Sequence, residues 1–426
     1  MNAHYLKVHA EKMKLRVLAD DLSGACDCVA GFALARGTSI PVYLDDRLAR
    51  GDGSWALDLD SRADDERVAR QKVERIMRSF SHDSSMLIFK KIDSTLRGNI
   101  AAEVAGALEA LADSTGVIVS PALPEQGRTL LGGKLFVHGR LYPIEGSKNL
   151  PGILEAAGFQ CALLRNEDAD PAKLRGDIEH ALAQGARAVV VDAQNEADLD
   201  RLARALSGYA GRVLLAGSAG LAKAFARTAC NGQAQDSDSA QDHAIVALDQ
   251  TVAIIGSFSM ETQAQLRLLK TCSNVDLVEC SATEWLDRSS VKRQRAIGLA
   301  QKFVAQGRSV VYAISGGPSG DWSRELVKAI AEAALPSLLA VRSLLLVGGD
   351  TARAVLEQLN ILQVNVVGEL EPGISTCRVQ SGRSETIYIK AGSFGDADTL
   401  QRFFSRASRS ITEPCRASAT SDGVPS

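Results

Sequence analysis

Two adjacent carboxylates, Asp20 and Asp21, stand where an apolar run over residues 15–19 gives way to a helical pattern. Like charges placed side by side are tolerated when a cation, a hydrogen-bond donor or a proton accompanies them. A general base, or an acid that binds a substrate hydroxyl, would meet that condition. Asp21 or Ser23 could instead simply cap the helix, but a cap needs only one such residue, whereas Asp20, Asp21 and Asp27 crowd one strand end. The pair therefore predicts chemistry at this strand end, with Asp20 and Asp21 as candidate catalytic and substrate-binding residues.

A second polar segment, KKIDSTLRGN, packs cations, a carboxylate and hydroxyls into one strand-to-helix loop. Arg97 offers a planar fork suited to a carboxylate, and Lys91 is a movable point charge. Asp93 and Ser94 could accept from or donate to substrate hydroxyls. A capped helix with solvated cations is the simpler alternative, but it leaves the density of polar groups unexplained. The segment therefore predicts an anionic, polyhydroxylated ligand, for which Arg62, after another strand end, is a weaker candidate.

A third segment, SPALPEQGRT followed by GGKLFVHGRLYP, predicts an ordered turn and a small hairpin. Arg128, Lys134 and Arg140 could extend the anion site, although hairpin residues usually lie at the surface. His138 is expected to be structural.

The C-terminal half carries glycine-rich turns at strand ends. Free amides at a helix start, together with glycine, allow a phosphate to approach the backbone closely. Neither a Walker loop nor a GxGxxG fingerprint is present. Glycine turns often exist only for tight packing, but several on one sheet edge could surround a nucleotide. The candidate nucleotide-binding residues are Ser257, Gly348, Gly349, Asp350, Thr351, Gly392 and Gly395.

These residues must be positioned by strands, and the chain repeats an apolar run, a polar loop and a helical pattern. Continuous apolar strands that alternate with helices predict an α/β fold with largely parallel, helix-covered sheets. In such sheets ligands bind beyond the carboxyl ends of the strands, where these loops lie. The expected strands cover 15–19, 86–92, 117–119, 213–216, 252–255, 310–314, 344–347 and 386–389.

A polar stretch, NGQAQDSDSAQDH, divides the chain. It predicts one domain over 1–230, a linker over 231–244 and a second domain over 245–405. The polar residues 406–426 are expected to form a flexible tail.

Composition limits the possible classes of function. The chain has 426 residues, 46% of them hydrophobic and 23% charged, which excludes a mostly disordered chain and allows two or three domains. A net charge of −3 gives no reason to expect nucleic acid as a partner. The eight cysteines are scattered, and no apolar run resembles a signal peptide or a membrane span, so a cytoplasmic protein is expected. Cysteines and histidines do not cluster at metal-ligand spacing, so no metal-binding residues are predicted.

Taken together, the motifs resemble the four-carbon acid sugar kinase family, long catalogued as a domain of unknown function. The matching stretches run in family order and reach to about residue 400. They are ADDLSGACD, KKIDSTLRGN, SPALPEQGRT, GGKLFVHG, GSFSMETQAQ, GGDTARAVLEQL, GELEPG and IKAGSFGD. Ser23, Asp350 and Ser393 are small departures that preserve the chemistry, whereas Cys26 and Cys28 are less usual.

The resemblance implies a reaction in the cleft between two α/β domains, with small-molecule partners, a sugar acid and ATP, and with Mg2+ as cofactor. It places the acid at Asp20 or Asp21, Arg62 and 91–97, and ATP at Ser257, 348–351 and 392–395. One of the two aspartates would orient or deprotonate the terminal hydroxyl of the acid. D-Threonate is the first expected substrate, with D-erythronate and 3-oxo-tetronate as alternatives.

Two other functions stay open at this point. A nicotinamide-dependent dehydrogenase would have similar sheets, but it needs a GxGxxG turn that the chain lacks. A non-catalytic sugar-acid sensor would use the two domains for binding alone. Stereochemistry of the substrate, the choice between the two aspartates and a homo-oligomeric state are left undecided by the sequence.

Overall fold

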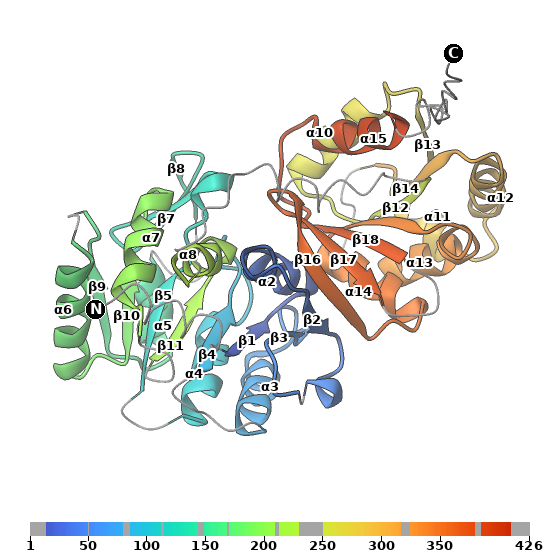
Figure 1. The fold of residues 1–426 in the computed structure, drawn as a ribbon. Helices are drawn as coiled ribbons and strands as arrows, with labels where there is room; N and C mark the ends of the chain where they lie inside the picture. Colours follow the sequence, from blue (N-terminus) through green and yellow to red (C-terminus); the bar gives the residue numbers. More distant parts are fainter. Residues whose placement is uncertain are drawn as a thin grey trace, which may run out of the picture.

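We describe the protein from a computed structural model, which covers residues 14–49, 51–79, 86–111, 115–143, 149–167, 170–208, 213–229, 250–316, 324–379 and 385–409. Two α/β units lie side by side and share one sheet (Figure 1). The two-domain α/β architecture predicted from the sequence is confirmed. The predicted linker over 231–244 lies outside the described residues.

The first unit is built on parallel strands with helices on both faces. Its strands in the large sheet are β1 (Lys14–Ala19), β2 (Ile40–Tyr43), β3 (Trp55–Asp58), β4 (Met86–Lys91), β5 (Gly116–Ser120), β9 (Cys161–Leu164), β10 (Ala188–Val191) and β11 (Val213–Gly217). Its helices are α2 (Leu22–Arg36), α3 (Glu66–Arg78), α4 (Ile100–Glu109), α5 (Leu150–Ala156), α6 (Pro171–Ala183), α7 (Glu196–Ala205) and α8 (Ala219–Ala229), with short 3-10 turns η1 (Asp46–Leu48) and η2 (Pro124–Gln126). A small antiparallel sheet comprises β6 (Arg128–Leu131), β7 (Lys134–Val137) and β8 (Arg140–Leu141).

The second unit combines parallel strands with an antiparallel hairpin. Its strands are β12 (Thr251–Ile255), β13 (Val275–Cys280), β14 (Ser309–Ile314), β15 (Ser343–Val347), β16 (Gln363–Glu371), β17 (Ile374–Val379) and β18 (Glu385–Lys390). Its helices are α10 (Met260–Leu269), α11 (Ala282–Leu286), α12 (Val291–Ala305), α13 (Arg324–Leu338), α14 (Gly349–Gln358) and α15 (Thr399–Arg409). Helix α15 runs four residues past the predicted domain end at 405, and the rest of the expected tail lies outside the described residues.

The two predicted sheets are joined edge to edge. The strand order is β13-β14-β12-β15-β18-β17-β16-β2-β3-β1-β4-β11-β5-β10-β9, a sheet of 15 strands among the described residues. The joint is an antiparallel pair between β2 and β16, in which Val42 faces Val364. Each strand would otherwise expose an unpaired edge, so pairing satisfies both sets of backbone groups.

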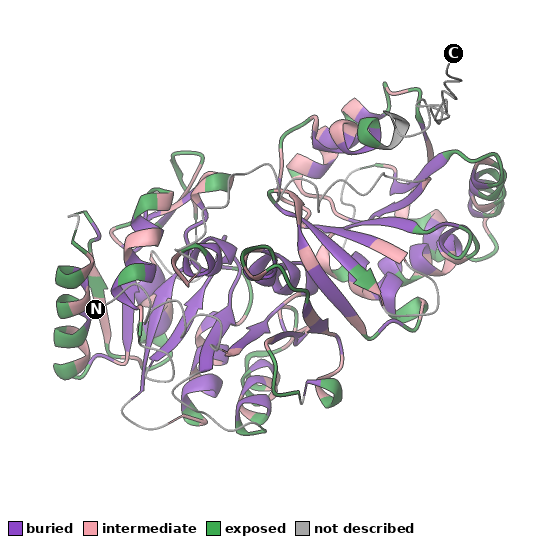
Figure 2. Ribbon diagram, in the orientation of Figure 1, coloured by how far each residue is buried: buried purple, intermediate pink, exposed green. Residues whose placement is uncertain are grey.

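Helix α2 lies over this joint and packs against β16 and β17 as well as on its own unit (Figure 1). Its residues from Leu22 to Ala30 are all buried (Figure 2). Cys26 and Cys28 belong to this packed stretch, and burial raises the pKa of the Cys28 thiol to about 12. A hydrogen bond to the Cys377 thiol and burial raise the pKa of Cys26. The two cysteines are therefore core residues of the joint rather than reactive thiols.

Helices cover both faces of the large sheet. In the first unit, α2, α6, α7 and α8 pack on one face, and α3, α4 and α5 pack on the other. In the second unit, α11 to α14 pack on one face of the sheet, and α10 and α15 pack on the other. No helix in the described part of the chain is long and apolar enough to cross a bilayer.

Candidate functional site

The sugar-acid candidates lie at the carboxyl ends of three neighbouring strands. β1 pairs with β3 on one side and with β4 on the other, both in parallel register. Asp20 and Asp21 follow β1, Arg62 follows β3, and Lys91 ends β4. Adjacent parallel strands bring their carboxyl ends to one edge, which explains why residues some 70 positions apart meet here.

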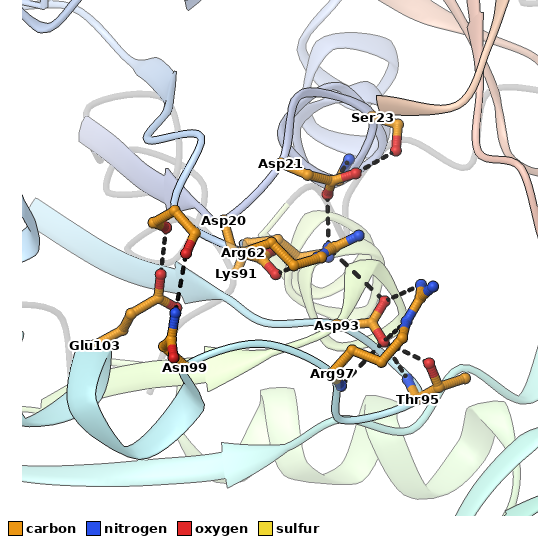
Figure 3. A network of polar contacts seen from close by, with 12 residues as sticks. Asp20, Asp21, Ser23, Arg62, Lys91, Asp93, Thr95, Arg97, Asn99 and Glu103 are labelled. Carbon is orange, nitrogen blue, oxygen red and sulfur yellow. Dashed lines mark hydrogen bonds and ion pairs between the residues drawn. The ribbon is translucent and has the colours of Figure 1, made fainter. Parts of the chain in front are cut away.

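Arg62 joins the loops of these strands (Figure 3). Its Nε donates to Asp20 Oδ2 at 2.7 Å, and its Nη2 donates to Asp21 Oδ1 at 2.9 Å. The same Nη2 lies 3.7 Å from Asp93 Oδ1. The guanidinium thus supplies the cation that the adjacent carboxylates need. Arg62 is occupied by three carboxylates and serves as their organiser.

The aspartate pair is split in character by its surroundings. Asp20 is 2% exposed, and burial alone would raise its pKa, but the Arg62 guanidinium together with Lys91 and Lys90 reverses this and lowers it. Asp21 is less buried and caps α2, since its Oδ1 accepts from the Gly24 amide at 3.0 Å. Its Oδ2 accepts from Ser23 Oγ at 2.7 Å. Asp21 is therefore a helix cap and a member of the carboxylate cluster at the same time.

Asp93 organises the second loop. Its Oδ2 accepts from Thr95 Oγ1 and from Arg97 Nε at 2.9 Å, and its Oδ1 accepts from Arg97 Nη2 at 2.9 Å. Burial would raise the pKa of Asp93, but Arg62, Arg97 and Lys91 hold it well below the usual range. The carboxylate stays ionised, and the fork of Arg97 is filled by Asp93.

Lys91 is the cation of this edge whose ammonium is not paired with a described residue. Its side chain is buried, and its ammonium has no hydrogen bond or ion pair to any described residue, although its charge acts on Asp20 and Asp93. A Cβ built on Gly24, at the start of α2, would stand 2.6 Å from Lys91 Nζ and 2.5 Å from Asp21 Oδ1. The ammonium, the carboxylate and the helix start therefore share one small space.

A second set of contacts, which the sequence did not indicate, fixes these loops from below. Lys90 points to the face of β4 opposite to that of Lys91 and pairs with Glu103 Oε2 of α4 at 3.0 Å, and Glu103 also accepts from Ser61 Oγ. Asn99 Nδ2 donates to the carbonyls of Ser61 at 3.1 Å and Asp64 at 2.8 Å. The loop that carries Arg62 is thereby tied to the loop that carries Asp93.

The nucleotide candidates also follow neighbouring strands. β15 pairs in parallel with β12 and with β18, so Ser257, the 348–351 turn and the 392–395 loop lie at one edge. A Cβ on Gly392 would overlap Ser257 Oγ, and Gly348 has a φ of 105°, which favours glycine. Thr262 Oγ1 donates to the Gly392 carbonyl at 2.6 Å and fixes the loop on α10. Glycine at these positions therefore allows the three loops to pack closely against one another.

Three of the nucleotide candidates have surroundings of their own. Asp350 is exposed in the first turn of α14. Gly395 has a φ of 84° and its amide donates to Gln126 Oε1 of the first unit at 3.1 Å. Thr351 is buried beside Gly256, where a Cβ would overlap its Oγ1.

The two groups of loops meet where the units join. A Cβ on Gly349 would overlap Asp21 Oδ2, so the start of α14 touches the aspartate that caps α2. Arg353 of α14 reaches back to Asp58 Oδ2, at the end of β3, at 2.7 Å. Arg128 of β6 donates to the Ser393 carbonyl at 2.9 Å.

The bridging role of Arg353 was not predicted from the sequence, and Arg128 was left open between an anion site and a surface position on a hairpin. Arg128 differs from the usual hairpin residue, because the loop over 391–395 covers its side chain and leaves it 4% exposed. The position of Arg128 directly after the SPALPEQG turn was a usable signal, but its burial depends on a segment more than 260 residues away.

Comparison with known families assigns both halves. A model described as a sugar-binding N-terminal domain matches residues 15–225, and a model described as a nucleotide-binding C-terminal domain matches residues 252–400. The chain is 32% identical over 421 residues to a D-threonate kinase from Cupriavidus necator, covering 91% of this chain and 96% of the relative. It is 27% identical over 436 residues to a 3-oxo-tetronate kinase from Salmonella typhimurium, covering 93% and 99%.

A solved structure shares the fold. A crystal structure of a Haemophilus influenzae protein of family DUF1537 superposes with a TM-score of 0.65 at 21% identity, covering 92% of this chain and 99% of that one.

Proposed function

The chain belongs to the four-carbon acid sugar kinase family, and we propose that it transfers the γ-phosphoryl group of ATP to the terminal hydroxyl of a four-carbon sugar acid. The observation that carries this proposal is the contact between Asp21, in the sugar-acid loops, and Gly349, in the nucleotide loops. Phosphoryl transfer depends mainly on positioning and charge stabilisation, so a carboxylate held against a phosphate-binding turn supports it.

Lys91 is the proposed ligand of the substrate carboxylate. Arg97 and, more weakly, Arg62 were also candidates by sequence, but their guanidinium groups are engaged by Asp20, Asp21 and Asp93. The Lys91 ammonium is buried without such a partner among the described residues. Pairing with an incoming carboxylate would compensate a charge that is otherwise costly to bury.

Asp21 is the proposed acceptor of the hydroxyl proton. Asp20 is enclosed by Arg62 and is nearly inaccessible, whereas Asp21 lies at the junction with the nucleotide loops. An aspartate at that position can orient the hydroxyl and take its proton as the oxygen attacks phosphorus. Asp93 and Ser94 are proposed to bind the other hydroxyls, because both lie buried in the adjoining loop.

ATP is proposed to bind at the glycine-lined edge formed by Ser257, the 348–351 turn and the 392–395 loop. Among the described residues no group of three or more His, Cys, Asp or Glu side chains is arranged to hold a metal. Mg2+ would therefore be held mainly by the phosphates, with Asp350 as the candidate protein ligand in the first turn of α14. Mg2+ held there would supply positive charge that offsets the negative charge of the phosphates.

D-Threonate is the first proposed substrate. A second D-threonate kinase, from Bordetella bronchiseptica, is 28% identical over 412 residues, which adds support from the relatives. Because relatives named 3-oxo-tetronate kinases are 26–28% identical, that acid and D-erythronate belong in the same test. D-Threonate and D-erythronate differ only in the direction of one hydroxyl, so the substrate loops must discriminate them by hydrogen bonds.

The test is Mg2+-dependent ADP release from ATP with D- and L-threonate, D- and L-erythronate and 3-oxo-tetronate. We expect one acid to exceed the others by at least about tenfold in kcat/KM. ATP binding without ADP release in the whole panel would contradict this acid class as acceptor, and an acid bound without ATP would support the sensor alternative. Size-exclusion chromatography with light scattering would test whether the protein forms a homo-oligomer.

A further inference from the structure

Arg128, the first residue of β6, reaches from the sugar-binding unit into a nucleotide loop. Its side chain is 4% exposed. Its Nη2 donates to the Ser393 carbonyl at 2.9 Å and to Ser393 Oγ at 3.1 Å. The guanidinium carbon lies 4.6 Å from the centroid of the Phe394 ring, which fixes the plane of the cation.

The other two guanidinium nitrogens of Arg128, Nε and Nη1, are buried and have no hydrogen-bond partner. No carboxylate in the described part of the chain forms an ion pair with this side chain. A buried cation whose donors are unpaired is destabilising, and an anion that binds beside it removes that cost. Arg128 therefore has the donors of an anion site.

Arg128 lies between the two sets of loops, because it belongs to the sugar-binding unit and contacts Ser393 and Phe394 of the nucleotide loop. Burial lowers the pKa of Arg128, while Asp93 of the sugar-acid loop and Glu261 of α10 oppose the lowering. Arg97 acts on Arg128 as a like charge, but its own fork is filled by Asp93. An anion bound at Nε and Nη1 would thus lie near both the sugar acid and the nucleotide.

We propose that Arg128 is a catalytic residue that donates Nε–H and Nη1–H to the γ-phosphoryl group during transfer, an inference that rests on the proposed kinase function. In that step the bond between the γ-phosphorus and the β,γ-bridging oxygen breaks and ADP leaves. A new bond forms between the phosphorus and the substrate hydroxyl oxygen, and the hydroxyl proton passes to Asp21. The arginine fork stabilises the negative charge on the non-bridging oxygens, where that charge is greatest.

The test compares wild type with Arg128→Met, Arg128→Lys and Arg128→Ala. Arg16→Met is the matched control, because Arg16 is also buried and its guanidinium carbon lies 4.7 Å from the centroid of the Trp55 ring. Arg16 is in the amino-terminal half of β1, away from the loop that carries Asp20 and Asp21. We would measure kcat and KM with the active acid, thermal unfolding, and the affinities for ADP and β,γ-imido-ATP. Guanidinium chloride would be added to Arg128→Ala as chemical rescue.

We expect Arg128→Met to lower kcat about 100-fold or more and to lower the affinity for β,γ-imido-ATP about tenfold. The affinity for ADP should change less than about threefold. Added guanidinium should raise the kcat of Arg128→Ala at least about tenfold. The kcat of Arg16→Met should equal that of wild type. An Arg128→Met kcat within about fivefold of wild type, or equal losses for ADP and the analogue without rescue, would overturn the proposal. If wild type uses no acid in the panel but the analogue is still selectively weakened, the proposed function fails and the γ-phosphate contact of Arg128 stands.

Discussion

Gly349 and Asp21, from different domains, leave no space between them for a side chain. A Cβ built on Gly349 would overlap Asp21 Oδ2 and would stand 3.2 Å from Asp21 Cγ. The absence of a side chain thus lets the first turn of the nucleotide-domain helix α14 approach the carboxylate that caps α2. A substitution here changes the spacing of the two domains without removing any functional group.

Gly349→Ala should therefore lower kcat/KM about tenfold or more, since a displacement of about 1 Å at a reacting centre costs up to about 100-fold. The protein should fold, because an alanine is well tolerated in a helix. Gly298→Ala is the control, because Gly298 lies within α12 and a Cβ there meets no atom within 4 Å. Steady-state kinetics of the two variants, with thermal unfolding, would test this. Equal activities would contradict a role for close apposition.

Asp21→Asn and Asp20→Asn should differ in kind. Loss of a general base lowers kcat by about 100- to 10,000-fold, so Asp21→Asn should do so while ADP affinity stays within about threefold. Asp20→Asn removes the negative charge that lies 2.7 Å from Arg62 Nε. This variant should bind the sugar acid less tightly, and its free energy of unfolding should be lower by about 3 kcal/mol. Kinetics, calorimetry and denaturant unfolding of both variants would separate the two roles. A larger loss of kcat for Asp20→Asn than for Asp21→Asn would instead identify Asp20 as the general base.

Much of the fold follows from local sequence. The eight expected strands all occur, because continuous apolar runs such as 15–19 and 344–347 are buried on both faces of the sheet. Strand β16 was not predicted, since its sequence QVNVVGELE mixes polar residues and glycine with short apolar stretches. Its pairing with β2 joins residues more than 300 positions apart, and such a register depends on the assembled tertiary structure.

The candidate residues could be chosen from the sequence, but the pairing of each cation with its carboxylate could not. From the sequence, Lys91 and Arg97 were candidate partners for a carboxylate, and Arg62 was a weaker one. In the structure, Arg62 forms ion pairs with Asp20 and Asp21, and Arg97 forms one with Asp93. The Lys91 ammonium has no ion pair to a described residue. Which charge compensates which depends on the order β3-β1-β4, which one sequence does not reveal.

Lys91→Met should raise the KM for the sugar acid about 10- to 100-fold and change the KM for ATP less than about threefold. The reason is that a hydrogen bond to a charged group contributes about 1.5–3 kcal/mol, and Lys91 is the proposed partner of the substrate carboxylate. Lys173→Met, at an exposed position on α6, is the control. Initial-rate kinetics with each substrate varied would measure both constants. An increase confined to ATP would place Lys91 at the phosphates instead.

A second interdomain contact predicts a pH dependence of stability. Lys223 of α8 is surrounded by three carboxylates, with Nζ at 2.6 Å from Glu125, 2.8 Å from Glu369 of β16 and 3.4 Å from Asp27. Burial, together with the nearby Asp27, raises the pKa of Glu369 from 4.5 to about 7, and this outweighs the opposing effects of Lys223 and the Gly373 amide. One ammonium cannot fully compensate three carboxylates, so Glu369 retains its proton to higher pH.

Because the pKa of Glu369 is higher in the folded protein, the folded state binds more protons than the unfolded state between about pH 4.5 and 7. The stabilising contribution is complete below pH 4.5 and is lost as the pH rises through 7. Glu369→Gln removes this titration and keeps an acceptor for the Gly373 amide, which donates to Glu369 at 2.6 Å. Between pH 5 and 8 the free energy of unfolding of wild type should therefore fall relative to that of the variant, by an amount on the order of 1 kcal/mol. Urea unfolding of both proteins at each pH would measure the difference, and parallel pH profiles would contradict the assignment of the proton to Glu369.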